Sequence, residues 1–369
     1  MTSRNTVDVL IIGGGVTGAS IAHHLALRGI TDVMVVDRAP GPGGGSTPRA
    51  TGGFRAQFET AVNVRLSMLA REKLLRFEDE TGVDPGFAQH GYLFLARSQR
   101  VLGLLRDAVA VQHSCGATES RVITAAEARA INPAIHDDAI IGGTFSHADG
   151  FIRAMQILRG YIESAERRGV RFVFGAEQSE FACAGDRIAV VKTSAGDFAP
   201  RVVVNAAGAW AAEISNVAIT PVERHVLPTV ETDVLDGSMP MTAWVDDGFH
   251  IRVRDRRVLL LAPPPMMESI ETTAHERVPC LRHVPVDRGA AWSGFYEMTP
   301  DHHAIIGRSS EYENLFIAGG SSGHGVMHAP AIGQLAAELI AGEPTTIDVH
   351  ALRPQRFAEG EGIASSELL

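Results

Sequence analysis

The chain is poor in cysteine and lacks a long apolar run. Cys115, Cys183 and Cys280 are its only cysteines and form no C-x-x-C pair, which excludes a disulfide framework or a zinc knuckle and fits a reducing compartment. No apolar stretch reaches the roughly 18 residues of a membrane span, and Met1 to Thr6 contain no signal-peptide core. We therefore expect no membrane association and a cytoplasmic protein.

Positive charge is also scarce. The 369 residues carry 33 basic and 43 acidic side chains, a net charge of -10, which argues against binding to nucleic acid or to an anionic membrane. Lys73 and Lys192 are the only lysines, so almost every basic residue is arginine. The histidines and acids show no ligand spacing, so we expect no metal site. The length suffices for two domains with substantial cores.

Residues 7–37 hold the first strong motif. VDVLII predicts a strand buried on both faces, Gly13, Gly15 and Gly18 satisfy G-x-G-x-x-G, and a helix and a second strand follow, ending at Asp37. A helix N-terminus behind such a turn binds a pyrophosphate, and a terminal acid accepts hydrogen bonds from a ribose diol while repelling a 2′-phosphate. The stretch predicts a dinucleotide site for NAD or FAD rather than NADP. An ordinary strand-helix crossover is the alternative.

A second glycine turn lies near the other end of the chain. LFIAG predicts a strand, GSSGHG a turn, and residues 329–341 a helix. A nicotinamide dinucleotide needs one such turn, whereas a flavin dinucleotide can use a second set of backbone donors at its ring. The pair of turns therefore favours FAD, and an ordinary turn is again the alternative.

Between these motifs the pattern alternates between helix and strand. Residues 38–58 predict an irregular loop, residues 150–168 a long amphipathic helix, and Thr124 with Glu127 a capping box. Separate strands are predicted at residues 201–205, 219–234, 244–253, 257–261 and 291–296, the last four in an antiparallel sheet. We expect the final dozen residues to be frayed.

Five segments together resemble the D-amino-acid-oxidase superfamily of FAD enzymes, in the sarcosine oxidase, glycine oxidase and proline dehydrogenase β-subunit branch. They are GGGVTGASIAHHLALRG, GSTPRATGGFRAQF, VVNAAGAW, YEMTPDHHAIIG and FIAGGSSGHGVMHAPAIGQ. The resemblance implies an α/β fold, with a Rossmann-like FAD domain of the glutathione-reductase type assembled from residues 1–85, 147–217 and 300–369. It also implies an antiparallel-sheet substrate domain from residues 86–146 and 218–299.

The resemblance also implies the cofactor site. The matching positions are Gly13, Gly15, Val16, Thr17, Gly18, Asp37, Arg38, Gly45, Ser46, Thr47, Ala50, Thr51, Gly52, Gly53, Ala176, Glu177, Ala207, Gly208, Trp210, Gly320, Gly323, His324, Gly325, Val326 and Met327.

The implied chemistry is oxidation of a carbon next to an amine. Arg55 matches the arginine that binds the substrate carboxylate in this family. For a second anchor the alternation along residues 250–254 suggests His250 and Arg252. We expect Arg254, Arg256 and Arg257 to form a solvated turn. His324 either contacts the flavin edge or supports the glycine turn, and His302 and His303 fit a structural or a functional role equally.

The sequence departs from the family at the positions that tether FAD and at two lysines. Gly294 and Arg49 stand where relatives have a tethering cysteine or histidine, so we expect FAD to be non-covalent. Met327 replaces a substrate-binding lysine, and no lysine stands near residues 259–262, which argues against a fast reaction with O2.

We expect an FAD-dependent amine oxidoreductase for glycine-like secondary amino acids, such as iminodiacetate, sarcosine and glycine. It would give an imine that hydrolyses to an amine and glyoxylate or an aldehyde, with O2 reduced to H2O2. The alternative enzyme is a proline-type dehydrogenase β-subunit that passes electrons to a partner chain. A non-enzymatic alternative is an assembly subunit with structural FAD. A partner subunit or a homo-oligomer fits either enzyme.

Overall fold

The central strands of the first sheet are short apolar runs whose side chains are buried on both faces. The computed structural model describes residues 5–264 and 266–364. Across this sheet the strands run β17 (Ile305–Arg308), β18 (Leu315–Gly319), β11 (Gly196–Asn205), β1 (Asn5–Ile12), β2 (Val33–Asp37) and β8 (Arg171–Phe174), while β9 (Gln178–Ala184) and β10 (Arg187–Thr193) form a hairpin beside β11. The five strands from β18 to β8 are parallel, as expected for runs without polar alternation.

Strand pairing in this sheet joins segments that are far apart in the sequence. β1 pairs with β11 in the register Ile12 to Asn205, and β11 pairs with β18 in the register Val203 to Leu315. Because parallel strands end at the same edge, the turns after β1, β11 and β18 come together there. This edge therefore brings the two predicted glycine turns into one region.

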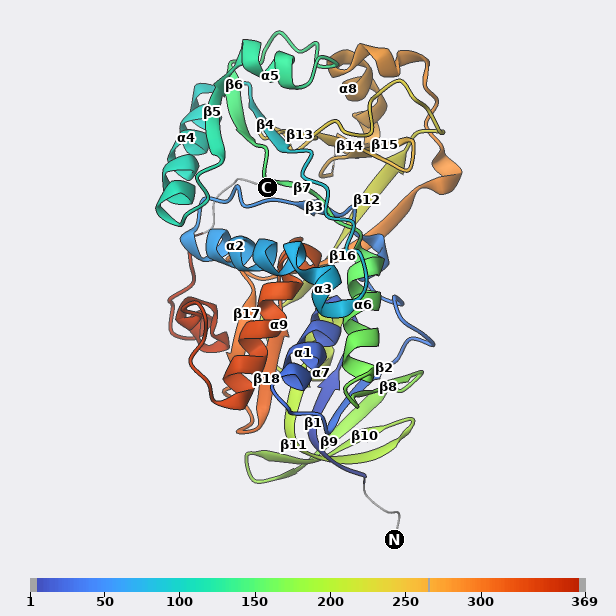
Figure 1. Ribbon diagram of the computed structural model, residues 1–369, viewed down its shortest axis with the longest axis vertical. Helices are drawn as coiled ribbons and strands as arrows, with labels where there is room; N and C mark the ends of the chain where they lie inside the picture. Colours follow the sequence, from blue (N-terminus) through green and yellow to red (C-terminus); the bar gives the residue numbers. More distant parts are fainter. Residues whose placement is uncertain (1–4, 265, 365–369) are drawn as a thin grey trace.

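A layer of helices covers one face of the first sheet. Figure 1 shows α1 (Val16–Leu27) between α9 (Gly325–Ala341) and α6 (Ala154–Glu166), with α2 (Ala61–Leu75) and the short α3 (Phe77–Thr81) beside them. A Cβ at Gly333 of α9 would lie 2.0 Å from Ser20 Oγ of α1, so glycine is required for this close helix contact.

The second sheet lies at the other end of the long axis (Figure 1). Its strand order is β16 (Trp292–Met298), β12 (Thr220–Pro228), β15 (Arg257–Leu261), β14 (His250–Arg254), β13 (Met241–Trp244), β4 (Tyr92–Ala96), β6 (Gly142–Ser146) and β5 (Ser120–Thr124). The accompanying helices are α4 (Gln99–Ser114), α5 (Ala125–Ile131) and α8 (Ile270–Arg277). The pairs are antiparallel except β4 with β13, which is parallel because these strands belong to different chain segments.

Several element bounds differ from those predicted. The strand expected at residues 244–253 is two strands, β13 and β14, joined by a turn at Gly248, where φ is 76°. The helix expected at 150–168 begins only at Ala154, because Gly150–Phe151 forms β7 and pairs with β3 (Gly53–Phe54). The capping box at Thr124 and Glu127 is confirmed.

The strands of the first sheet and those of the second come from alternating parts of the chain. The domain bounds 1–85, 147–217 and 300–369 against 86–146 and 218–299 stay a prediction, because strand membership does not fix where a domain ends. Within residues 5–264 and 266–364, no helix combines the length and apolarity that a membrane crossing requires.

Candidate functional site

A cavity of about 730 Å³ lies where the strand ends of the first sheet meet one face of the second sheet. Its walls include the turns after β1, β2 and β11, the loop at residues 43–53, and the second glycine turn. Strands β12, β14, β15 and β16 of the second sheet form the remaining wall, which we call the roof of the cavity. The structure thus brings segments from both ends of the chain to one space.

Most of the predicted site residues line this cavity. They are Gly13, Gly15, Val16, Thr17, Asp37, Arg38, Gly45, Ser46, Thr47, Ala50, Thr51, Gly52, Gly53, Arg55, Ala176, Glu177, Ala207, Gly208, Trp210, His250, Gly323, His324, Gly325, Val326 and Met327. Gly18, Gly320 and Arg252 do not line it.

The glycines of the first turn meet different surroundings. Gly13 has a φ of 110°, and a Cβ there would lie 2.4 Å from the carbonyl oxygen of Ala206. A Cβ at Gly18 would lie 1.9 Å from the Gly13 oxygen, so Gly18 is needed for packing inside the turn. At Gly15 the nearest atom is Thr47 Oγ1 at 3.5 Å, so protein packing does not require glycine and the open side faces the cavity. This is the approach that a pyrophosphate needs.

Asp37 stabilises this turn and retains capacity for a ligand. Its Oδ2 accepts the N–H of Gly14 at 2.7 Å, and its Oδ1 accepts that of Ala39 at 2.8 Å. A carboxylate has about four acceptor positions, so hydrogen bonds from a ribose diol remain available. The residues present therefore fit the predicted dinucleotide.

The second glycine turn precedes a long helix. His324 is the N-cap of α9, and Gly323 has a φ of 94° and would place a Cβ 2.6 Å from the Tyr296 ring. The N-terminus of a 17-residue helix, with its free N–H groups and dipole, favours an anionic ring edge at this place. Gly320 does not line the cavity but is needed for the turn itself. Its φ is 69°, and a Cβ there would lie 2.5 Å from Thr299.

Glu297 was not predicted as a site residue. Its side chain lies between the second glycine turn, at Ser321, and the turn after β11, at Gly208. Its Oε1 accepts the N–H of Ser321 at 3.1 Å, and a Cβ added at Gly208 would lie 3.5 Å from its Oε2. Burial raises the pKa of its carboxyl.

Tyr92, Arg224 and Tyr296 also line the cavity without having been predicted. In the sequence, only alternation along the strands could have indicated these residues. Alternation shows which residues share a face, but the sheet register is needed to know which face lines the cavity.

Arg55 is buried in the cavity wall, with 3% of its surface exposed. Its guanidinium donates to the carbonyl of Gln57, lies 4.0 Å from the centre of the Phe58 ring, and has Nη2 3.1 Å from His324 Nε2. Because a guanidinium only donates, His324 Nε2 accepts and the proton of this neutral imidazole is on Nδ1. His324 therefore both caps α9 and orients Arg55.

A buried carboxylate fixes the loop that carries Arg55. Asp149 accepts the N–H of Ala56 at 2.8 Å and the side-chain amide of Gln57 at 3.1 Å. Burial raises the pKa of Asp149 to about 6, while these hydrogen bonds and the charge of Arg55 oppose the rise. Asp149 thus provides a nearby negative charge and two hydrogen bonds that hold the loop in place.

His250 lies on the roof of the cavity as a neutral base. Its Nδ1 is 2.9 Å from the carbonyl oxygen of Gly248, which can only accept, so Nδ1 carries the proton and Nε2 has the lone pair. Burial, assisted by the charge of Arg55, lowers the pKa of His250. The ring is therefore neutral at neutral pH, with Nε2 unprotonated.

Arg252 lies on the same strand face as His250 but does not reach the cavity. Its guanidinium lies 3.7 Å from the centre of the Phe151 ring and donates to the carbonyl of Thr51, beside a second cavity of about 290 Å³. Arg254 Nη1 donates to the carbonyl of Ala50 at 3.1 Å. At Arg252, two residues after His250, β14 crosses the loop at residues 50–53. Arg252 and Arg254 therefore position that loop. The expectation of a solvated Arg254 is wrong in this respect.

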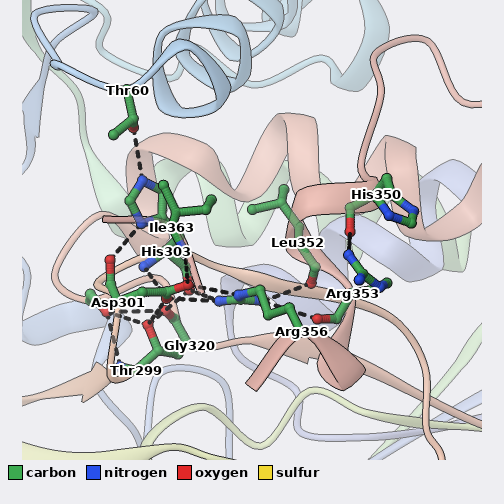
Figure 2. A network of polar contacts seen from close by, with 11 residues as sticks. Thr60, Thr299, Asp301, His303, Gly320, His350, Leu352, Arg353, Arg356 and Ile363 are labelled. Atoms are coloured by element: carbon green, nitrogen blue, oxygen red, sulfur yellow. Dashed lines mark hydrogen bonds and ion pairs between the residues drawn. The ribbon is translucent and has the colours of Figure 1, made fainter. Parts of the chain in front are cut away.

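The TPDHH turn is held by a network of polar contacts shown in Figure 2. Asp301 forms a bidentate ion pair with Arg356, with distances of 2.8 and 2.9 Å, and Arg356 has no exposed surface. His303 Nε2 is 2.8 Å from Thr60 Oγ1, which supports a structural role for His303. Ile363 N–H donates to Asp301 Oδ2 at 3.1 Å, so the expected fraying is wrong up to this residue, while residues 365–369 lie outside the described range.

The two positions at which the family resemblance implies an FAD tether, Gly294 and Arg49, face each other. A Cβ at Gly294 would lie 2.6 Å from Arg49 Cβ, and both residues line the cavity. Neither side chain can form the thioether or histidyl link. In the part of the chain that the structure describes, no group of three histidine, cysteine or acidic side chains is placed to hold a metal ion.

Comparison with known proteins places the chain in a family. The family model for FAD dependent oxidoreductases matches residues 8–339. Mitochondrial dimethylglycine dehydrogenase of Rattus norvegicus is 25% identical over 397 residues, which are 96% of this chain and 45% of that protein. The chain thus spans less than half of that relative.

Solved structures show the same fold over nearly the whole chain. L-proline dehydrogenase from P. horikoshii has a TM-score of 0.89 and 28% identity, covering 98% of this chain and 100% of that one. Glycine oxidase from Geobacillus kaustophilus has a TM-score of 0.82 and 23% identity, covering 96% and 99%, a likeness of fold. The family match and two glycine turns in one cavity together show that this chain belongs to the FAD dependent oxidoreductase family, with FAD as its cofactor.

Proposed function

We propose that the chain oxidises the C–N bond of glycine-like secondary amino acids, such as iminodiacetate, sarcosine or glycine. The observation that carries this proposal is the buried guanidinium of Arg55 in the wall of the cavity that contains both glycine turns. A buried cation held by three neighbours is suited to bind a carboxylate in one orientation. The names of the dimethylglycine dehydrogenase and the glycine oxidase are consistent with such a substrate.

The residues around Arg55 divide the remaining work. FAD, when bound, would supply the acceptor for one hydride equivalent, that is, two electrons and one proton from the carbon next to the amine. Arg55 holds the substrate carboxylate, and His250 Nε2 accepts the ammonium proton so that the amine is neutral when it reacts. The imine product is then hydrolysed to an amine and glyoxylate or an aldehyde. Tyr92, Met241 and Leu261 add apolar surface to the cavity lining.

The electron acceptor is proposed to be O2, which would be reduced to H2O2. A proline-type dehydrogenase β-subunit, passing electrons to a partner chain, is the second candidate. The likeness to L-proline dehydrogenase over the full length of both chains favours it, as does the absence of lysine from β15. Either enzyme is compatible with a homo-oligomer or a partner subunit.

Two assays test the reaction and its acceptor. Under anaerobic conditions, an amine substrate should bleach the absorbance of the bound flavin, and a panel of N-substituted glycines, glycine and proline covers the proposed class. If no member bleaches the flavin, the proposed reaction is wrong. Oxygen uptake by the single chain then identifies an oxidase, whereas turnover only with artificial dyes identifies a dehydrogenase.

FAD is proposed to be bound without a covalent link, because neither Gly294 nor Arg49 offers an attachment atom. Precipitation with acid should release all of the flavin into the supernatant. Flavin that stays with the precipitate would contradict this part of the proposal.

A further inference from the structure

One cationic side chain of the cavity has no role in the scheme above. Arg224 lies on β12 opposite Gly294 of β16, at a position where the partner strand offers no side chain. Val226, two residues farther along β12, pairs with Leu261, which in turn pairs with His250. Residues two apart on a strand share a face, so Arg224 is on the roof face that carries His250. Arg224 accordingly lines the same cavity.

In the described part of the chain, Arg224 has no protein carboxylate as a partner. Among the described residues, no carboxylate oxygen lies within 4.0 Å of its guanidinium nitrogens, and its only hydrogen bond, of 3.3 Å, goes to the carbonyl of Glu223. The Glu223 carboxylate instead accepts a hydrogen bond from Ser293 at 2.6 Å. The charge of Arg224 is therefore available to a ligand, and guanidinium groups bind carboxylates in a bidentate manner.

The charges of Arg224 and Arg55 both influence Tyr296 in the cavity wall. The Arg224 guanidinium lies 5.7 Å from the centre of the Tyr296 ring. Burial raises the pKa of the Tyr296 hydroxyl, and the charges of Arg224 and Arg55 both oppose this rise. Tyr296 lines the cavity together with Arg55 and Arg224. Two cationic side chains on one cavity suit a ligand with two negative groups.

We propose that Arg224 binds a second carboxylate, and that the preferred substrates are secondary amines with two carboxylate-bearing arms. The proposal rests on the proposed function, since Arg55 holds the first carboxylate. It replaces Arg252, which is occupied by the carbonyl of Thr51, as the second anchor. Iminodiacetate is the smallest member of this class, and sarcosine has the same amine with only one carboxylate.

Binding of non-oxidisable analogues tests the proposal without turnover. Oxydiacetate and methoxyacetate replace the amine nitrogen of iminodiacetate and sarcosine with an ether oxygen. Calorimetric titration of the FAD-loaded protein should show tighter binding of oxydiacetate. The Arg224→Ala variant should weaken oxydiacetate at least about tenfold and methoxyacetate less than about threefold, as expected for loss of one charge-assisted pair. Arg224→Lys should give an intermediate loss.

A control and a separate readout make the result decisive. Arg282→Ala removes an exposed guanidinium outside the cavity and should change neither ligand. Equal weakening of both ligands in Arg224→Ala, or no weakening of oxydiacetate, would overturn the second anchor. Bleaching of wild-type flavin by the amine panel reports independently on the reaction. Arg224-dependent binding without bleaching would thus reject the proposed function and retain the dianion site.

Discussion

At the scale of single residues, the charged groups of the cavity are oriented before a substrate arrives. Arg55 is held by the Gln57 carbonyl, the His324 imidazole and the Phe58 ring. His250 is held by Gly248 with its lone pair free of that contact. Such preorganisation lowers the entropy lost when a small amino acid binds.

Arg55→Gln should raise KM for the best amine substrate by about 10- to 100-fold, since a charge-assisted hydrogen bond contributes about 1.5–3 kcal/mol. FAD should stay bound, because the change leaves both glycine turns intact. Steady-state kinetics and the ratio of flavin to protein absorbance measure the two effects, with Arg282→Gln as the control. An unchanged KM would show that the carboxylate is anchored elsewhere.

At the scale of elements, the first turn shows that glycines of one motif are needed for different reasons. Gly18 is required by the protein, because a Cβ would meet the Gly13 oxygen at 1.9 Å. Gly15 is not required by the protein, because its nearest neighbour would be Thr47 Oγ1 at an ordinary 3.5 Å. We expect that glycine at this position instead leaves space for the pyrophosphate of FAD.

Gly15→Ala should therefore fold normally and bind FAD at least about tenfold more weakly, whereas Gly18→Ala should not fold stably, since its Cβ has no space. Circular dichroism of the apo-proteins and FAD titration by flavin fluorescence separate the two effects. Wild-type FAD affinity in Gly15→Ala would show that the cofactor does not approach this residue.

The contact between α1 and α6 contains buried histidines. His23 Nδ1 is 3.0 Å from Ser164 Oγ, and burial lowers the pKa of His23 from 6.5 to about 3. His24 is buried beside it, and burial lowers its pKa as well. In the folded protein both rings are therefore neutral at physiological pH.

This contact predicts loss of stability in mild acid. The unfolded chain binds a proton at His23 below pH 6.5, but the folded chain does so only near pH 3, so the free energy of unfolding falls as the pH drops between these values. Between about pH 7 and 5 the loss should be about 2 kcal/mol for His23. Urea unfolding with saturating FAD should show a smaller pH dependence in His23→Gln by that amount. Equal pH dependence in both proteins would refute this origin.

At the scale of the whole molecule, the C-terminal segment that contains Arg356 packs against the turn that contains Asp301. Arg356 connects it to Asp301 in the turn beside the second glycine turn, where Thr299 N–H donates to Ser322 Oγ at 3.1 Å. The turn also contacts α2 through His303 and Thr60, the N-cap of that helix. The segment therefore connects to the second glycine turn, which we expect to bind the flavin end of FAD.

Arg356→Met should lower the free energy of unfolding by about 3–5 kcal/mol, because it leaves the Asp301 carboxylate buried without its ion pair. The double variant Arg356→Met with Asp301→Asn should be less destabilised than the sum of the single variants. Urea unfolding of all four proteins measures the coupling. Additive losses would show that the two side chains contribute independently.

Local signals in the amino-acid sequence were sufficient for both glycine turns and the capping box at Thr124. Each depends on residues within a few turns of one another, where backbone geometry and hydrogen bonding are set by the residue types themselves. Alternation along a strand was also sufficient to identify His250 and Arg252 as residues on one strand face. The fold class and the cofactor followed from five segments spread along the chain, taken together, that resemble a known family.

Only the tertiary structure decided which cations reach the cavity. β12 and β14 are set in register by their pairing with β15 and β16, and the loop at residues 50–53 crosses β14 at Arg252 rather than at His250. The same holds for Arg356, whose partner Asp301 lies 55 residues away. Such contacts depend on packing between distant segments, so no local pattern of residues contains them.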